Sequence, residues 1–242
     1  MRFSICSGNH GNSNSITDTV TWLQRALQEC GHRADINTGI EPRAVNILIE
    51  HFVDEKALRD LLEGRRLGAR YLLIATEPIV GGVFNGGIES QHWHYGNTDY
   101  WRLRFDAFKI AARMAEEIWV LAESMLPAYE QLFPDLPVRF LPHGHVNELA
   151  CVRQRPEPER DIDFYFSGSM TEHRRRILSE LARRHVVVVN DQTTPEYLRQ
   201  DHLSRAKVCL SLRLSPRNCI PSVSRMHFHL QNRSFLLHEA YE

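Results

Sequence analysis

The chain lacks several features that would assign it to a class at once. It has five cysteines but no Cys-x-x-Cys pair, so a disulfide framework or a zinc site is not expected, and free thiols fit a reducing compartment. Its net charge is −1, so no overall field draws it to nucleic acid or to a membrane surface. No apolar run reaches the length of a signal peptide or a membrane span. These absences predict a cytoplasmic protein without nucleic-acid partners.

The residues that are present predict an α/β fold with two domains. The 242 residues suffice for two small domains, and a hydrophobic share of 43% can fill their cores. Near-continuous apolar runs at 45–49 and 71–75 are separated by an amphipathic helical pattern, which is typical of parallel strands covered on both faces. We predict two Rossmann-like βαβ domains that face a cleft, at residues 1–149 and 150–242. A charged, proline-bearing linker at 150–160 would join them.

The stretch from Asp161 to Leu178 carries the clearest motif of the second half. Alternating apolar residues predict a strand, the small residues 167–169 predict a tight turn, and helical periodicity begins soon after. A helix N-terminus at the carboxyl end of a strand presents unpaired N–H groups and a positive partial charge, and Arg174 to Arg176 add formal charge. This pattern predicts a phosphate site around Gly168 and Ser169. An ordinary turn with solvated arginines is the alternative.

A second unit of strand, loop and helix lies nearer the carboxyl end. A predicted strand at 208–212 leads through a loop into a helix from about Ser222. Arg213, Arg217 and Arg225 converge on that loop and on the start of the helix. Arginines beside a helix N-terminus again favour an anion.

In the first half, polar residues follow the buried strands at the sheet edge where ligands of such folds bind. His10 lies in the small, polar loop at 8–14, and it is a candidate for contact with an acceptor; a solvated histidine is the alternative. Glu77 directly follows the apolar run at 71–75. We predict that it binds the acceptor or acts as a general base, against a capping or solvated carboxylate.

The segment at 79–99 contains five glycines and no periodicity, and we predict that it is an acceptor loop. His92 and Trp93 are its candidate acceptor contacts, because aromatic faces suit sugars; an aromatic side chain that anchors the loop to the core is the alternative. His92 and His94 would face one side of a strand, but no third ligand is identifiable. No metal is therefore predicted.

Four stretches together resemble one family. They are the strand, turn and helix at 161–178, Ala75 to Pro78, Leu141 to Gly144, and Ala206 to Ser211 followed by Arg225 through Glu239. In this order they resemble the glycosyltransferase-like proteins that include spore-coat maturation proteins, a bacterial group with the two-Rossmann architecture called GT-B. The resemblance implies transfer of a sugar from a nucleoside-diphosphate sugar to a glycan, protein or small-molecule acceptor. It implies no further cofactor, since arginines and helix ends would take the place of a cation.

The resemblance also implies roles for residues. In that family an acidic residue recurs at the position of Glu77, and an arginine and a glutamate lie near the donor at the positions of Arg225 and Glu239. A Pro-x-Gly stretch stands at the crossing between domains, so His143 becomes a candidate for the cleft, against a simple turn residue. We thus expect catalytic roles for Glu77 and His143, and donor binding by Gly168, Ser169, Arg174, Arg213, Ser222, Arg225 and Glu239.

Two departures from the family keep other hypotheses open. Ser224 stands where the family has a glutamate, and the chain ends soon after a strand where the family continues, so we expect a second domain that is truncated at its carboxyl end. A non-catalytic module that binds a nucleotide sugar or a glycan is the alternative function. A metal-dependent enzyme built on the His-x-His pairs that begin at 92, 143 and 227 is a third.

Overall fold

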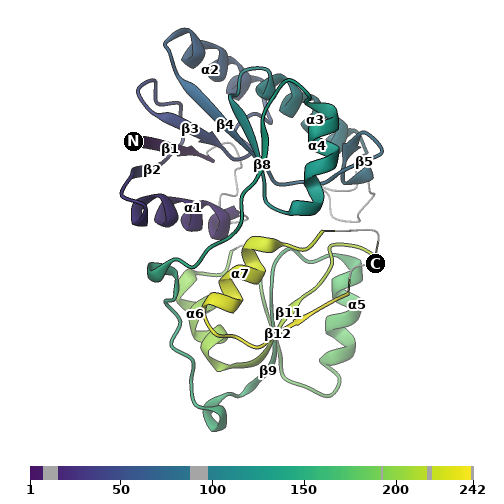
Figure 1. The fold of residues 1–242 in the computed structure, drawn as a ribbon. Helices are drawn as coiled ribbons and strands as arrows, with labels where there is room; N and C mark the ends of the chain where they lie inside the picture. Colours follow the sequence, from purple (N-terminus) through teal and green to yellow (C-terminus); the bar gives the residue numbers. More distant parts are fainter. Residues whose placement is uncertain (8–15, 88–97, 192, 217–219, 241–242) are drawn as a thin grey trace. The chain divides into compact units, whose positions relative to one another are not determined.

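The computed structural model describes residues 1–7, 16–87, 98–191, 193–216 and 220–240. The described residues form two compact units, one ending at Gly144 and the other beginning at His145 (Figure 1). We call them unit 1 and unit 2. Each unit contains a parallel β-sheet with helices packed against it, which confirms the predicted α/β class and is compatible with Rossmann-like domains.

Unit 1 is built on a six-stranded sheet in which every neighbouring pair is parallel, in the order β2-β1-β3-β4-β7-β8. The apolar runs that predicted central strands form β3 and β4, and nearly all of their residues are buried. Their carboxyl ends lie at one edge of the sheet, where Glu50 and Glu77 follow them. The strands are Arg2–Cys6 (β1), Arg33–Asn37 (β2), Val45–Leu48 (β3), Arg70–Ala75 (β4), Glu117–Val120 (β7) and Val138–Phe140 (β8).

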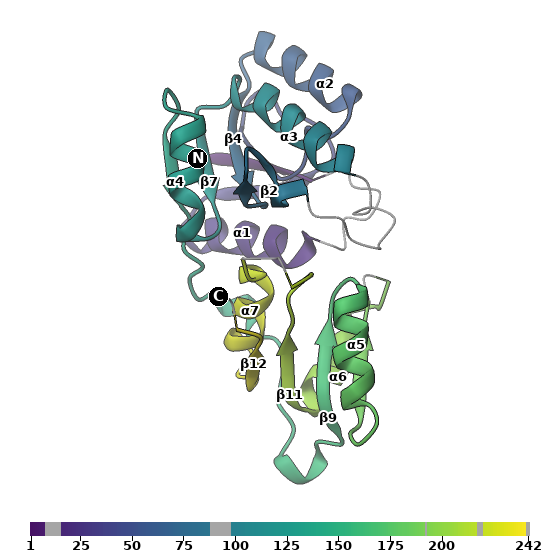
Figure 2. The same ribbon diagram turned by 90° about the vertical axis from the view of Figure 1, so that its right-hand side faces the viewer.

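The helices of unit 1 cover both faces of this sheet. Helix α1 lies on one side, whereas α2 and α3 lie on the other (Figures 1 and 2). The side chain of Asp54 caps α2 by accepting a hydrogen bond of 2.7 Å from the backbone N–H of Ala57. Trp101, Phe105 and Phe108 form the buried stripe of α3, as their spacing predicts. The helices are Thr17–Glu29 (α1), Glu55–Arg66 (α2), Thr98–Ala112 (α3) and Leu126–Leu132 (α4).

A small hairpin follows β4 in a region that we expected to be loop throughout. Ile79–Val80 (β5) pairs antiparallel with Val83–Phe84 (β6). Gly81 and Gly82 form the two-residue turn, with φ of 59° and 78°, a region that other residues enter only with strain. The hairpin places Asn85 directly after it. Short 3-10 helices occupy Asn85–Gly87 (η2), Glu123–Met125 (η3), Asn147–Leu149 (η4) and Glu157–Glu159 (η5).

Unit 2 has a four-stranded parallel sheet in the order β10-β9-β11-β12. Helix α5 packs on one face, and α6 and α7 pack on the other (Figure 2). None of the helices in the described part of the chain has the length and apolar character that a membrane span requires. The elements are Ile162–Ser167 (β9), Glu172–Leu181 (α5), Val187–Asn190 (β10), Glu196–Arg205 (α6), Ala206–Ser211 (β11), Val223–Gln231 (α7) and Leu236–His238 (β12).

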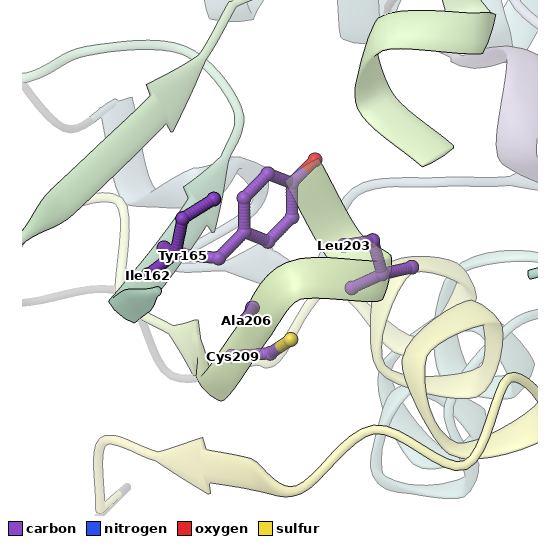
Figure 3. Close-up of a cluster of buried hydrophobic side chains, with 5 residues drawn as sticks. All are labelled: Ile162, Tyr165, Leu203, Ala206 and Cys209. Carbon is purple, nitrogen blue, oxygen red and sulfur yellow. The ribbon is translucent and has the colours of Figure 1, made fainter. Parts of the chain in front are cut away.

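Two apolar clusters hold the unit 2 sheet to its helices. On the α6 and α7 face, Tyr165 and Cys209 pack with Leu203 of α6; the cluster also includes Ile162 and Ala206 (Figure 3). The hydroxyl of Tyr165 points away from Ala206 and Cys209 in this view, and burial raises its pKa to about 12. On the α5 face, the buried cluster consists of Phe166, Leu178, Leu210 and Leu212.

The cysteines divide into buried and exposed thiols. Cys6 in β1 and Cys209 in β11 are buried, and Cys30 and Cys151 are exposed. Burial raises the pKa of Cys6 to about 11 and that of Cys209 to about 12. Cys219 lies outside the described residues.

Candidate functional site

The residues predicted to bind the donor gather at one edge of the unit 2 sheet. Gly168 directly follows β9, Arg213 lies just beyond β11, and Glu239 directly follows β12. Because these strands are parallel neighbours, their carboxyl ends meet. Helices α5 and α7 begin at the same edge, since each follows one of these strands. In open α/β sheets this is the edge at which ligands bind.

Gly168 and Arg225 are in direct contact at this edge. A Cβ atom on Gly168 would lie 2.9 Å from Nη2 and 3.0 Å from Cζ of Arg225, so a side chain there would push the guanidinium aside, and the glycine has a φ of 143°. The guanidinium also lies near the Phe166 ring, with Cζ 6.0 Å from its centroid. The missing side chain thus lets a half-buried cation lie on the turn that leaves β9.

The guanidinium of Arg174, unlike that of Arg225, is buried and donates several hydrogen bonds to backbone carbonyls. It is buried, and its Nη1 donates to the carbonyl of Ser169 at 2.7 Å, while its Nη2 donates to that of Leu212 at 2.9 Å and its Nε to that of Arg213 at 3.0 Å. These bonds tie the first turn of α5 to the end of β11. Such geometry argues against direct phosphate contact by Arg174, because its donors already hold protein carbonyls. Its structural role is to hold the turn after β9 to the segment that follows β11.

Glu239 is held by protein groups at both of its carboxylate oxygens. Oε2 accepts from the backbone N–H of Arg213 at 2.8 Å, and Oε1 lies 2.8 Å from Nε2 of His173. The Arg213 side chain turns away and donates to the carbonyls of Pro216 and, at 3.3 Å, Ala240. Glu239 and Arg213 therefore organise the end of β11 in this arrangement.

The remaining predicted donor contacts are backbone or small polar groups. The N–H of Gly168 donates to the carbonyl of Asn190 at 3.0 Å, which ties the turn to the end of β10. Ser222 is exposed at the start of α7, where its side chain makes no capping hydrogen bond. At α5 the N-cap is Thr171, whose hydroxyl accepts from the N–H of Arg174 at 3.3 Å.

In unit 1, Glu77 belongs to a buried charged cluster at the carboxyl edge of the sheet. Its Oε1 accepts from Nη2 of Arg104 at 2.9 Å, and its Oε2 accepts from the amide of Asn85 at 2.7 Å. Nε of Arg104 also donates to Glu50 at 2.7 Å. The hydroxyl of Thr76 donates to Glu50 as well. Exposure of the side chains is 3% for Glu50, 6% for Arg104 and 23% for Glu77, so only Glu77 reaches the surface to an appreciable extent.

The electrostatics of this cluster favour a fixed charge on Arg104. Burial lowers the pKa of Arg104, but the two carboxylates outweigh that effect, and its pKa lies well above the usual value. Aromatic rings enclose the cation, with Cζ 5.2 Å from the Trp101 centroid and 5.7 Å from that of Tyr100.

Backbone conformation sets the cluster apart from the rest of unit 1. Glu50 has a φ of 58° and Asn85 a φ of 53°, and no other described non-glycine residue of unit 1 has a positive φ. Such strain costs free energy and persists where surrounding contacts enforce it, which happens often at functional sites. The arrangement presents one partly exposed carboxylate, that of Glu77, whose oxygens accept from the Arg104 guanidinium and the Asn85 amide.

The other candidates of unit 1 lie elsewhere or outside the described residues. The ring of His143 stacks on Trp22 of α1, with centroids 4.1 Å apart and planes at 22°, while Trp22 Nε1 donates to the carbonyl of Gly144 at 3.1 Å. His10, His92 and Trp93 are not among the described residues, so their predicted roles stay predictions. The described part of the chain holds no group of three or more His, Cys, Asp or Glu side chains arranged to bind a metal.

Three residues at these edges were not predicted. Glu50 lies two residues after the end of a buried strand, as Glu77 does, and that position was its signal. Arg104 lies three residues after Trp101, on the apolar stripe of α3, so its burial was readable from helical spacing. His173 pairs with Glu239 across 66 residues of sequence, and no local pattern announces that contact.

Comparison of the sequence with protein families and with curated proteins finds no match. No protein-family model matches the chain, and no curated protein is significantly similar to it in sequence. The resemblance to the glycosyltransferase-like group therefore stays a prediction that rests on motif order.

Proposed function

We propose that the protein is a glycosyltransferase of the GT-B type. In this proposal unit 2 binds a nucleoside-diphosphate sugar at the carboxyl edge of its sheet, and unit 1 binds the acceptor near Glu77. The bond between the anomeric carbon and the diphosphate oxygen breaks, and the diphosphate leaves with the electron pair. A bond forms between that carbon and an acceptor hydroxyl oxygen, whose proton passes to a base.

The observation that carries the proposal is the contact between Arg225 and Gly168. A guanidinium offers a planar fork of donors that matches two phosphate oxygens, and contacts of this kind are stronger than neutral hydrogen bonds. Here the absence of a side chain on Gly168 lets the fork lie against the turn that precedes α5. The N-termini of α5 and α7 at this edge add a positive partial charge.

Glu77 supports the acceptor half of the proposal. Arg104 and Asn85 hold its carboxylate at hydrogen-bond distance, so its orientation is set before a ligand arrives. Each oxygen retains capacity for a further hydrogen bond. We assign to Glu77 the acceptor hydroxyl, and the role of base if the anomeric configuration inverts.

Isothermal titration of the full chain with UDP, GDP and ADP tests the proposal. At least one should bind, and Arg225→Met should weaken that binding by roughly 10- to 100-fold, because a hydrogen bond to a charged group contributes about 1.5–3 kcal/mol. Arg184→Met is the matched control, since Arg184 is exposed beyond the far end of α5. If the wild-type chain binds none of the three nucleotides, the proposal fails.

A non-catalytic module that binds a nucleotide sugar is the second candidate. It is favoured by Glu239, because both oxygens of this carboxylate already hold protein groups, and by Ser224 in place of the acidic residue of the resembling family. A module of this kind would bind a nucleotide but neither transfer nor hydrolyse any sugar donor. Release of nucleoside diphosphate from sugar donors, with and without pooled acceptors, distinguishes the two candidates.

A further inference from the structure

His173 and Glu239 form a hydrogen-bonded pair above the end of β11. Nε2 of His173 lies 2.8 Å from Oε1 of Glu239, whose other oxygen accepts from the N–H of Arg213 at 2.8 Å. The N–H of Glu239 in turn donates to the carbonyl of Ser211 at 3.0 Å. The carboxylate is thus held at both oxygens, the backbone of Glu239 is held as well, and the carboxylate fixes the imidazole ring.

The second ring nitrogen of His173 has a different environment. Nδ1 is buried, and it has no hydrogen-bond partner among the described residues. The side chain keeps 11% of its exposure, so part of the ring still reaches the surface. An unsatisfied buried polar atom costs free energy, and a native protein that retains one commonly uses it for a ligand, an ion or a water molecule.

We propose that Nδ1 of His173 contacts a phosphate oxygen of the ligand of unit 2, and that Glu239 is its positioning residue. This inference rests on the proposed function and names a further binding residue of the same site. Glu239 accepts from Nε2–H, and a hydrogen bond to the anion from the other nitrogen requires a proton on Nδ1 as well. Binding requires a small movement that uncovers Nδ1.

The surroundings favour an anion over a ligand hydroxyl. His173 is the second residue of α5, where the backbone N–H groups give the helix its positive end. Arg225 places a cation at the turn that precedes the same helix. Among the described bonds, the Glu239 carboxylate contacts only Arg213 and His173. This fits a residue whose task is to orient the His173 ring that touches the ligand.

Amide substitutions separate the two ring nitrogens. Glutamine at position 173 places its NH₂ group near the position of Nε2, so His173→Gln keeps the bond to Glu239 and loses the group at Nδ1. Asparagine places its NH₂ group near Nδ1, so His173→Asn does the reverse. Glu180→Gln is the matched control for charge, because Glu180 is exposed in the same helix and pairs only with Arg183 among the described bonds.

The assay is isothermal titration of the full chain with inorganic pyrophosphate, UDP and uridine. We expect His173→Gln to weaken binding of pyrophosphate and UDP by roughly 10-fold or more, with uridine unchanged and thermal stability close to that of wild type. His173→Asn should retain more affinity than His173→Gln. Glu239→Gln should also weaken both phosphate ligands, and its effect should not add to that of His173→Gln, because the two residues act as one unit.

Three results would overturn the inference. If His173→Gln binds pyrophosphate and UDP with wild-type affinity, the His173–Glu239 pair serves only to hold α5 to the end of β12. Loss confined to uridine makes Nδ1 a contact for a nucleoside hydroxyl. If His173→Gln fails to fold, unchanged pyrophosphate affinity in a folded Glu239→Gln is the overturning result. Failure of the wild-type chain to bind any nucleotide is different, since that result removes the proposed function itself.

Discussion

Replacement of Arg174 by methionine should cost stability and leave no direct defect in the contact to phosphate. The side chain is 5% exposed, and its guanidinium donates to the carbonyls of Ser169, Leu212 and Arg213. Methionine fills much of the volume of the stem, but the three acceptors lose their partner. An unsatisfied buried acceptor costs about 1–3 kcal/mol, and water will compensate in part at Ser169 and Arg213, whose residues are half-buried.

The net loss is therefore about 3 kcal/mol of the free energy of unfolding of unit 2. For a unit of roughly 100 residues, each kcal/mol lowers the melting temperature by roughly 4–8 °C, so we expect a decrease of roughly 12–24 °C. Scanning calorimetry of the full chain measures it. Arg184→Met should melt close to wild type, because Arg184 is exposed.

The opposite result would refute this reasoning. If Arg174→Met melts within about 2 °C of wild type and binds nucleotide at least tenfold more weakly, the guanidinium is a ligand group, and the carbonyl contacts contribute little. At a temperature where both variants are folded, Arg174→Met should bind nucleotide better than Arg225→Met does.

Three further predictions follow from buried contacts. Gly168→Ala should weaken nucleotide binding, because a Cβ atom would lie 2.9 Å from Nη2 of Arg225, at a φ of 143°, and would push the guanidinium off the turn; affinity equal to that of wild type in titration would show that the guanidinium does not need its present place. Arg104→Met should lower the free energy of unfolding by about 3–5 kcal/mol, since it leaves the buried Glu50 without its cation. In urea unfolding, adding Glu50→Gln to this variant should recover part of the loss; no recovery would mean that packing, not charge, explains it. Burial, and to a lesser degree Arg225 and Arg199, lower the pKa of His229 from 6.5 to about 3. The unfolded chain therefore binds the proton first as pH falls, so the free energy of unfolding has its full value above pH 6.5 and decreases by about 1.4 kcal/mol per pH unit toward pH 3. His229→Phe should flatten the curve of unfolding free energy between pH 6 and 4, and an unchanged slope would assign that pH dependence to other groups.

The elements that the sequence predicted well are those in which one physical signal dominates. β3 and β4 are buried on both faces, so their apolar runs are nearly continuous, with Asn46 as the polar residue inside β3. β2 was missed because it is an edge strand with Arg33 and Asp35 on it, and one buried residue, Ala34, is too weak a pattern. The β5–β6 hairpin had a readable signal, since Gly81-Gly82 lies between two apolar pairs.

The candidate sites show a second limit, which concerns arginine. Arg174 lies three and four residues before Ile177 and Leu178, and Arg104 holds the same relation to Ala107 and Phe108, so both lie on the apolar stripe of their helix. Helical spacing alone would therefore have been enough to predict that these guanidinium groups are buried and bonded to protein, but we did not apply it to them. We predicted that Arg174 binds the donor because its positive charge lies near a turn. That prediction did not consider which face of the helix the arginine occupies.

Contacts distant in sequence were beyond any local pattern. The pairing of Glu50 with Arg104 spans 54 residues and that of His173 with Glu239 spans 66. Both depend on which strands become neighbours, because parallel order brings separate strand ends to one edge. Glu77 and Glu239 were singled out by position, but their partners required the fold.

The buried thiols can report how fast each unit opens. Cys6 lies within the unit 1 sheet and Cys209 within the unit 2 sheet, and each has a raised pKa in addition to its burial. A disulfide reagent such as dithionitrobenzoate will modify the exposed Cys30 and Cys151 rapidly, whereas Cys6 and Cys209 react only when their surroundings open. Mass spectrometry of the two slow sites then gives opening rates for unit 1 and unit 2 separately, in one unmutated chain. A ligand that protects Cys209 but not Cys6 would reveal itself as a ligand of unit 2 by kinetics alone.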